Sequence, residues 1–157
     1  MFWSKKKTPK DVIDLDLIKY YEGFSAKPYL CPAGKPTIGY GNTTYPDGTK
    51  VTLKDKPITQ KQADEMLRAY WEKEIWAKIE NDAMKLDLSD DQIAALSSLI
   101  YNIGWAAFSK SQCWKAIKKK DWGETFLNWD WINAGGKPMK GLIKRRAEEL
   151  FLFTKDL

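Results

Sequence analysis

Hydrophobic residues recur every three to four positions over most of the chain, which is the spacing of amphipathic helices. The pattern predicts six helices, over about residues 9–21, 60–82, 90–103, 110–119, 122–130 and 140–153. Two of these helices begin at the spacing of a capping box, in Thr59 with Gln62 and in Ser89 with Gln92. Gly104 is a suitable C-terminal cap for the helix that Ser89 begins.

Residues 23–57 have a different pattern, rich in glycine and proline, in which short β-favouring pieces alternate with turns. Asp47-Gly48 is a dipeptide typical of hairpins. We expect a small three-stranded antiparallel sheet there. The fold class is therefore α+β, with a β-containing lobe over about 9–58, and a long connecting helix and larger helical lobe over about 59–157. The whole chain of 157 residues has the size of a single domain, with residues 1–8 disordered.

The absence of histidine limits the chemistry more than any other feature of the composition. It excludes Ser-His-Asp and Cys-His catalysis and histidine-bound zinc. Two cysteines provide neither a four-cysteine metal site nor a disulfide framework, so we expect no metal and no cofactor. No apolar run is long enough for a membrane helix, and the N-terminal residues do not form an ordinary signal peptide.

The net charge of +5 comes from the last third of the chain. Residues 1–109 carry 15 basic and 15 acidic side chains, whereas residues 110–157 carry 11 basic and 6 acidic ones. Such a surface binds polyanions, namely nucleic acid, anionic lipid or acidic wall polymers, or it is only a solvated helix face. No nucleic-acid-binding motif accompanies it, so we expect no nucleic-acid partner.

Three residues are candidates for catalysis. Glu22 lies beside aromatic residues at a helix end, where poor solvation favours the protonated carboxyl of a general acid. Taken alone, a glutamate near a helix end is usually solvated surface. Cys31 lies in a turn and Thr37 begins the next strand. Taken singly, Cys31 is an ordinary buried thiol and Thr37 an ordinary strand residue.

The spacing of these three residues resembles the catalytic signature of phage-type lysozymes, the endolysins of glycoside hydrolase family 24. Glu22 is followed after eight residues by Cys31, and Cys31 after five residues by Thr37. Two further blocks are similar to the family, one from Ala95 to Phe108 and one from Trp129 to Leu150. The resemblance covers about residues 12–153.

This resemblance implies a lysozyme-like fold and hydrolysis of the β-1,4 bond between N-acetylmuramic acid and N-acetylglucosamine, leading to lysis of the host cell. It makes Glu22 the general acid. Cys31 stands where many relatives have aspartate, and with Thr37 it would orient the attacking water. A nucleophilic Cys31 is the alternative, but the resemblance favours inversion of configuration.

The resemblance also implies residues that contact the sugar and residues that pair with the acid. Tyr101, Asn102 and Ser111 fall near positions that line the sugar cleft in the family, and Gly39 and Tyr40 belong to the block that includes Thr37. Trp129 is a further candidate for sugar binding, because it flanks the Gly-Gly loop and sugars stack on aromatic faces. Arg145 or Arg146 is the expected ion-pair partner of Glu22, unless the two arginines belong to a solvated helix face.

A non-catalytic, peptidoglycan-binding lysozyme-like module is the competing function, because a thiol replaces the usual second carboxylate. The expected partners are peptidoglycan and, through the basic C-terminal third, anionic envelope polymers. We expect a monomer without stable membrane insertion. The chain lacks the signal-arrest helix of many relatives, which implies accumulation in the host cytoplasm until a pore protein gives access to the wall.

Overall fold

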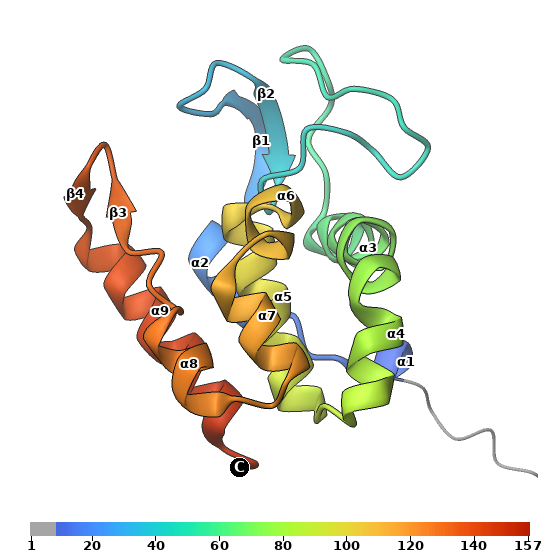
Figure 1. The fold of residues 1–157 in the computed structure, drawn as a ribbon. Coiled ribbons are helices and arrows are strands. Elements are labelled where there is room, and N and C mark those ends of the chain that lie inside the picture. Colours follow the sequence, from blue (N-terminus) through green and yellow to red (C-terminus); the bar gives the residue numbers. More distant parts are fainter. Residues whose placement is uncertain (1–8) are drawn as a thin grey trace, which may run out of the picture. The chain divides into compact units, whose positions relative to one another are not determined.

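The structure is a computed structural model that describes residues 9–157 (Figure 1). The predicted disorder of residues 1–8 lies outside the described residues. The chain divides into two compact units. The N-terminal unit is Leu15–Glu74, and the helical unit is Ile75–Leu157 with the described residues before Leu15. The division falls within a π-helical segment, η1 (Glu72–Trp76).

The N-terminal unit places a two-stranded hairpin against a helix (Figure 1). Its elements are α2 (Asp16–Glu22), β1 (Ser25–Leu30), β2 (Pro36–Gly39) and α3 (Gln60–Trp71). The antiparallel register pairs Tyr29 with Thr37 and Leu30 with Pro36. α3 packs against β2, and Ile38, Val51 and Met66 form the buried core between strand, loop and helix.

The predicted third strand does not form, so the prediction of a three-stranded sheet is wrong. The Asp47-Gly48 turn is present, but the chain on its two sides forms no strand and is joined by an isolated bridge between Thr44 and Lys50. Gly39 and Gly41 explain the short ladder, because their φ angles of +66° and +91° turn the chain away from an extended path. β2 therefore ends after four residues.

The helical unit is built around helices that pack in pairs (Figure 1). α5 (Asp90–Ile103) lies along α9 (Lys140–Thr154), and α7 (Gln112–Lys118) packs against α8 (Trp122–Leu127). The remaining helices of this unit are α1 (Pro9–Val12), α4 (Ala77–Leu86) and α6 (Trp105–Ser109). Its largest fully buried side chains include Leu96, Leu99, Phe108 and Phe153.

Both predicted capping boxes are confirmed, with reciprocal hydrogen bonds between Thr59 and Gln62 and between Ser89 and Gln92. Gly104 ends α5 as predicted. The helix predicted to start at Thr59 continues through η1 to Leu86, beyond its expected end.

The first predicted helix is wrong in one respect, because it is broken into α1 and α2. Ile13 and Leu15 are both buried although they lie two positions apart, a spacing that an extended segment allows and a helix does not. Gly135-Gly136 forms the turn of a second hairpin, β3 (Asn133–Ala134) with β4 (Lys137–Pro138). Within residues 9–157 no helix combines the length and hydrophobicity needed to cross a membrane.

Candidate active site

Glu22 is the last residue of α2, and its position depends on the glycine that follows. Gly23 has a φ of +69° and a ψ of 152°, a conformation that is essentially restricted to glycine, and its N–H donates to the Lys19 carbonyl at 3.0 Å. This turn leads directly into β1 and leaves the Glu22 side chain partly exposed. Glu22 lines an open depression of about 330 Å³ together with Gly23, Phe24, Ser25 and Tyr29.

Cys31 follows β1 in a tight turn whose backbone surrounds the thiol with donors. The Gly34 N–H donates to the Cys31 carbonyl at 2.7 Å, and the Cys31 N–H donates to the Lys35 carbonyl at 3.0 Å. The backbone N–H groups of Lys35 and Ala33 and the Thr37 hydroxyl lie close enough to the sulfur to stabilise a negative charge on it. These donors, the Lys35 N–H first, lower the pKa of Cys31 below the ordinary thiol value of 9.0, against an opposing contribution from burial. The turn therefore favours the thiolate.

Thr37 lies beside this thiol. It is 2% exposed, and its hydroxyl lies 2.9 Å from the Lys35 carbonyl, to which it can donate. The turn over residues 31–36 brings Cys31 and Thr37 together, because it returns the chain from β1 to the antiparallel β2.

Tyr29 lies within electrostatic range of both Glu22 and Cys31, and it was not among the residues predicted from the sequence. Burial raises the pKa of its phenol, and the negative charges of Glu22 and Cys31 raise it further. The phenol thus lies within electrostatic range of both groups. Its position two residues before Cys31 could have predicted this placement, because alternate residues along a strand share a face.

Gly39 and Tyr40 are both buried, and their predicted contacts with the sugar stay a prediction. A Cβ at Gly39 would lie 3.4 Å from the Cβ of Ala63 on α3. Tyr40 is 2% exposed, with its ring centroid 5.8 Å from that of Phe24. Gln60 donates to the Tyr40 hydroxyl at 3.4 Å.

The other four residues predicted to bind substrate belong to the helical unit. Tyr101 is half-buried and Asn102 is exposed, both at the end of α5. Ser111 caps α7, because its hydroxyl accepts from the Trp114 N–H at 3.1 Å. Trp129 is 3% exposed and packs edge-on against Phe153, and its predicted role in sugar binding stays a prediction.

Arg145 and Arg146 take part in a buried ion network around Glu149, a residue that the sequence analysis did not single out. Glu149 is fully buried, and its carboxylate lies 3.3 Å from Nε of Arg145 and 2.7 Å from Nε of Arg146. Ser98 donates to the same carboxylate at 2.6 Å and Trp129 at 3.1 Å. The predicted contact of one arginine with Glu22 stays a prediction, because Glu22 belongs to the other unit.

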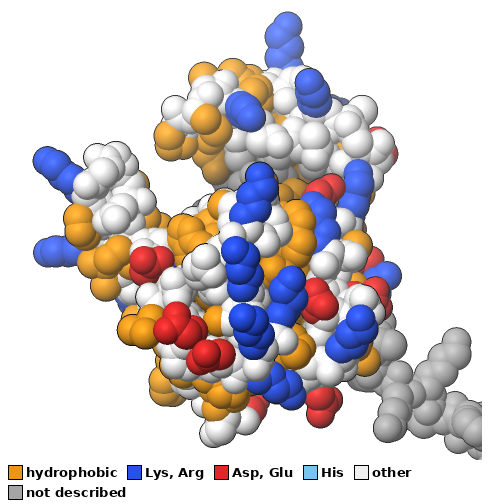
Figure 2. All heavy atoms as spheres, in the orientation of Figure 1, with side chains coloured by type: hydrophobic (Ala, Val, Ile, Leu, Met, Phe, Trp, Pro, Cys, Tyr) orange, Lys and Arg blue, Asp and Glu red, His pale blue; other side chains and the backbone are white. Residues whose placement is uncertain are grey.

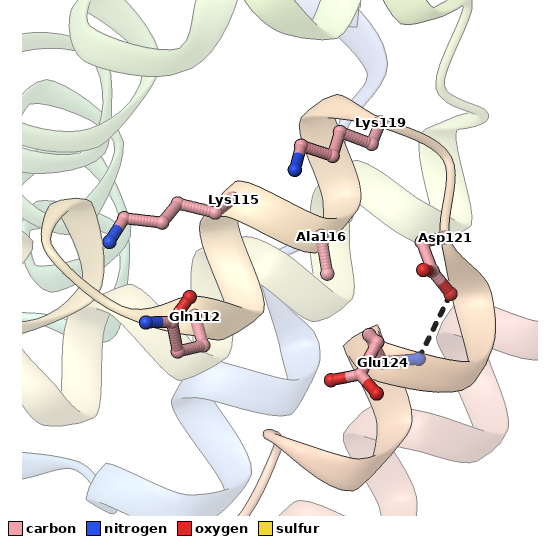
Figure 3. A pocket seen from close by; sticks show the side chains of 6 residues that line it. All are labelled: Gln112, Lys115, Ala116, Lys119, Asp121 and Glu124. Atoms are coloured by element: carbon pink, nitrogen blue, oxygen red, sulfur yellow. Dashed lines mark hydrogen bonds between the residues drawn. The ribbon is translucent and has the colours of Figure 1, made fainter.

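Lysine side chains gather along the exposed side of α7 in the helical unit (Figure 2). The hollow between α7 and α8 contains Lys115 and Lys119, but also Asp121 and Glu124 (Figure 3). Asp121 Oδ1 accepts from the Glu124 N–H at 3.1 Å as an N-cap. Across residues 9–157 no three potential His, Cys, Asp or Glu ligands are grouped to hold a metal ion.

Comparison with known proteins identifies the family. The family model described as phage lysozyme matches residues 19–149, most of the chain. The chain belongs to the phage lysozyme family. As a member it is a glycoside hydrolase that acts on peptidoglycan.

Individual relatives agree with this assignment over nearly their full lengths. An endolysin of Acyrthosiphon pisum secondary endosymbiont phage 1 is 38% identical over 147 residues, which are 88% of this chain and 93% of the relative. The endolysin of Salmonella phage P22 is 32% identical over 141 residues, covering 87% and 91%. Among solved structures, the muramidase domain of SpmX from Asticaccaulis excentricus has a TM-score of 0.71 at 28% identity, covering 91% and 97%. The lysozyme-like fold is therefore confirmed.

Proposed function

We propose that this lysozyme hydrolyses the β-1,4 bond between N-acetylmuramic acid and N-acetylglucosamine, with Glu22 as general acid and the Cys31–Thr37 pair as the group that orients and deprotonates water. The main support for this proposal is the turn over residues 31–36. The N–H groups of this turn and the Thr37 hydroxyl lie near the Cys31 sulfur and favour its anionic form. An anion at this position can take the place of the second carboxylate of a glycosidase.

The proposed reaction is a single displacement. Water attacks the anomeric carbon of the muramic acid residue while the bond from that carbon to the leaving oxygen breaks. Glu22 gives its proton to the leaving oxygen, and the Cys31 thiolate takes a proton from the water. Thr37 orients the water, because a hydroxyl that donates to the Lys35 carbonyl still has lone pairs to accept with. The product has a new reducing end at muramic acid with inverted configuration.

The test measures new reducing ends at muramic acid in purified peptidoglycan. Glu22→Gln should lose at least about 100-fold in rate, since general acid catalysis contributes roughly 10²–10⁴-fold. Glu65→Gln is the matched control, because Glu65 is an exposed glutamate of α3 in the same unit. Equal activity of Glu22→Gln and the native chain would exclude Glu22 as the acid, and absence of reducing ends from the native chain would favour the binding module.

The role of Cys31 has its own readout. Nuclear magnetic resonance of the first product anomer distinguishes inversion from retention. A covalent sugar adduct on Cys31, detected by mass spectrometry together with a retained anomer, would replace the water-orienting role with the nucleophilic one. We also propose that Arg145 or Arg146 forms an ion pair with Glu22 and helps to hold the general acid in position.

The basic C-terminal third is proposed to bind anionic polymers of the cell envelope. Lys118, Lys119 and Lys120 are exposed at and just after the C-terminal end of α7. Replacing all three with glutamine should reduce killing of intact cells without changing hydrolysis of isolated wall. The control replaces the exposed Lys54 and Lys56 in the N-terminal unit, and equal loss of both activities in the first variant would contradict the idea.

We further propose that the enzyme is a monomer that acts on the cell wall after release from the host cytoplasm through a separate pore protein. Two relatives, from Escherichia phage P1 and Haemophilus phage HP1, bear the name SAR-endolysin. Expression of this chain alone should leave host cells intact, and a pore-forming membrane protein added later should cause rapid lysis. Lysis by the chain alone would contradict the need for a pore.

A further inference from the structure

The N-terminal unit contains a second hollow, which none of the proposed catalytic residues lines. Its volume is about 330 Å³, and we call it the lysine groove; it is lined by Lys35, Pro36, Thr43, Thr44, Lys50 and Val51. Two backbone interactions join its sides: the bridge between Thr44 and Lys50, and the Val51 N–H donating to the Thr43 carbonyl at 2.9 Å.

The loop that carries one side of the groove is held by its own hydrogen bonds. The Tyr45 N–H donates to the Thr49 carbonyl at 2.8 Å, and the Thr49 N–H donates to Asp47 Oδ1 at 2.9 Å. Tyr45 also donates through its hydroxyl to Asp55 Oδ2 at 2.9 Å. The groove is therefore largely formed before any ligand arrives, which reduces the entropy cost of binding.

The charge of the groove points to an anionic ligand. Its lining combines two lysines with two threonines and includes no acidic residue. The acidic side chains of the adjoining loop have other partners, because Asp47 accepts from Thr49, and Asp55 accepts from Tyr45 and Thr52. Ammonium and hydroxyl groups together are suitable donors for a carboxylate, whose oxygens accept several hydrogen bonds.

Lys35 connects the groove with the candidate active site. Its backbone N–H and its ammonium charge both lower the pKa of Cys31, and its carbonyl lies 2.9 Å from the Thr37 hydroxyl. The same residue lines the groove. A polymer whose scissile bond lies at Cys31 and Thr37 therefore passes the residue that the candidate site and the groove share.

We propose that the lysine groove binds carboxylate groups of the peptide stem attached to muramic acid. This proposal rests on the proposed function, because only a chain that cuts the glycan brings the stem to this position. The sugars of a stem-bearing glycan strand carry no charge, since their lactyl groups are used in amide bonds to the stem. The charge of the substrate lies in the stem carboxylates, and the groove gives the enzyme a means to distinguish peptidoglycan from neutral glycans.

The experiment measures binding and cleavage with the same soluble, uncross-linked glycan strands. One sample keeps native stems, and a second has its stem carboxylates converted to neutral methylamides. Binding is measured by calorimetry in the Glu22→Gln background, so that the strands stay intact. Native strands should bind about threefold more tightly than amidated ones, the size expected of an exposed charge pair. The difference should shrink as salt is added, because exposed charges are screened.

Lys50→Glu tests the groove without touching the proposed catalytic residues, and Lys54→Glu is its control. Lys54 is an exposed lysine of the same unit outside the groove, so both variants have the same net charge. Lys50→Glu should bind native and amidated strands equally, whereas Lys54→Glu should keep the threefold preference. Lys50→Gln should fall between the native chain and Lys50→Glu.

Two different failures can be told apart. Equal binding of native and amidated strands by the unaltered groove, or equal loss in the Lys54→Glu control, would overturn the proposal. Either result leaves the proposed function intact as long as the native chain releases reducing ends from the strands. Absence of cleavage of both kinds of strand would instead overturn the proposed function and the groove's role with it.

Discussion

Replacing Glu149 with glutamine should destabilise the protein far more than an exposed substitution on the same helix. The Glu149 carboxylate is fully buried and is shared by two guanidinium groups that are themselves 4% and 2% exposed, those of Arg145 and Arg146. The hydroxyl of Ser98 and the indole of Trp129 complete its hydrogen bonds. Glutamine keeps the shape of the side chain but removes the negative charge between two buried positive charges.

The magnitude follows from this burial. Breaking a buried ion pair by removing one partner costs about 3–5 kcal/mol, because the remaining charge is left in a poorly polarisable interior. Glutamine keeps one acceptor oxygen, so we expect the lower end, about 3 kcal/mol. For a chain of this size each kcal/mol lowers the melting temperature by roughly 2–4 °C, which gives a fall of about 6–12 °C.

Urea unfolding and thermal melting, both followed by far-ultraviolet circular dichroism, measure the effect. Glu148→Gln is the control, since Glu148 is its neighbour on α9 and lies 3.7 Å from Lys144 in an exposed pair. Such pairs contribute about 0–1 kcal/mol. A loss of less than about 1 kcal/mol in Glu149→Gln, or equal losses in the two variants, would refute the reasoning.

Three further predictions concern the candidate site. Iodoacetamide should alkylate Cys31 with a pH midpoint below 9.0 and should leave Cys113 of the folded protein unmodified, because burial raises the pKa of Cys113 to about 12. Mass spectrometry measures the alkylation of each cysteine, and equal labelling of both would contradict this prediction. Cys31→Asp should retain hydrolysis of the cell wall, whereas Cys31→Ser should lose most of it, because a serine hydroxyl does not ionise near neutral pH. The release of new reducing ends measures the activity of both variants. Gly23→Ala should lower the free energy of unfolding by about 1–3 kcal/mol, because Gly23 has a positive φ angle. Gly141→Ala, in the helix α9, should leave the free energy of unfolding unchanged or raise it, and urea unfolding measures both variants.

The helices could be predicted from local sequence wherever a cap or a terminating glycine marks their ends. Thr59, Ser89 and Gly104 act within a few residues of themselves, so their effects are visible in the sequence. The missing third strand depends on positive φ angles at Gly39 and Gly41, and glycine allows such angles without requiring them. Local pattern alone therefore could not decide between a ladder and a single bridge.

The pairing of the two arginines shows a second limit. Arg145 and Arg146 precede Glu149 by four and three residues, a spacing that brings helix neighbours together. The three side chains form a buried ion network because the packing of α5 against α9 removes them from solvent. The sequence contains the charges, but the partner of each charge depends on residues such as Ser98, 47 positions before Arg145.

At the candidate active site, the residue types were visible in the sequence and their ionisation was not. The lack of histidine and the spacing of Glu22, Cys31 and Thr37 were enough to select a carboxylate and a thiol. A thiol alone is a poor substitute for aspartate at neutral pH, which favoured a binding module as the alternative. The turn changes this balance, because its backbone N–H groups, the Thr37 hydroxyl and the charge of Lys35 lower the pKa of Cys31. A backbone that stabilises an anion acts on aspartate and cysteine alike, so the turn favours the anionic form of whichever of the two residues stands at this position.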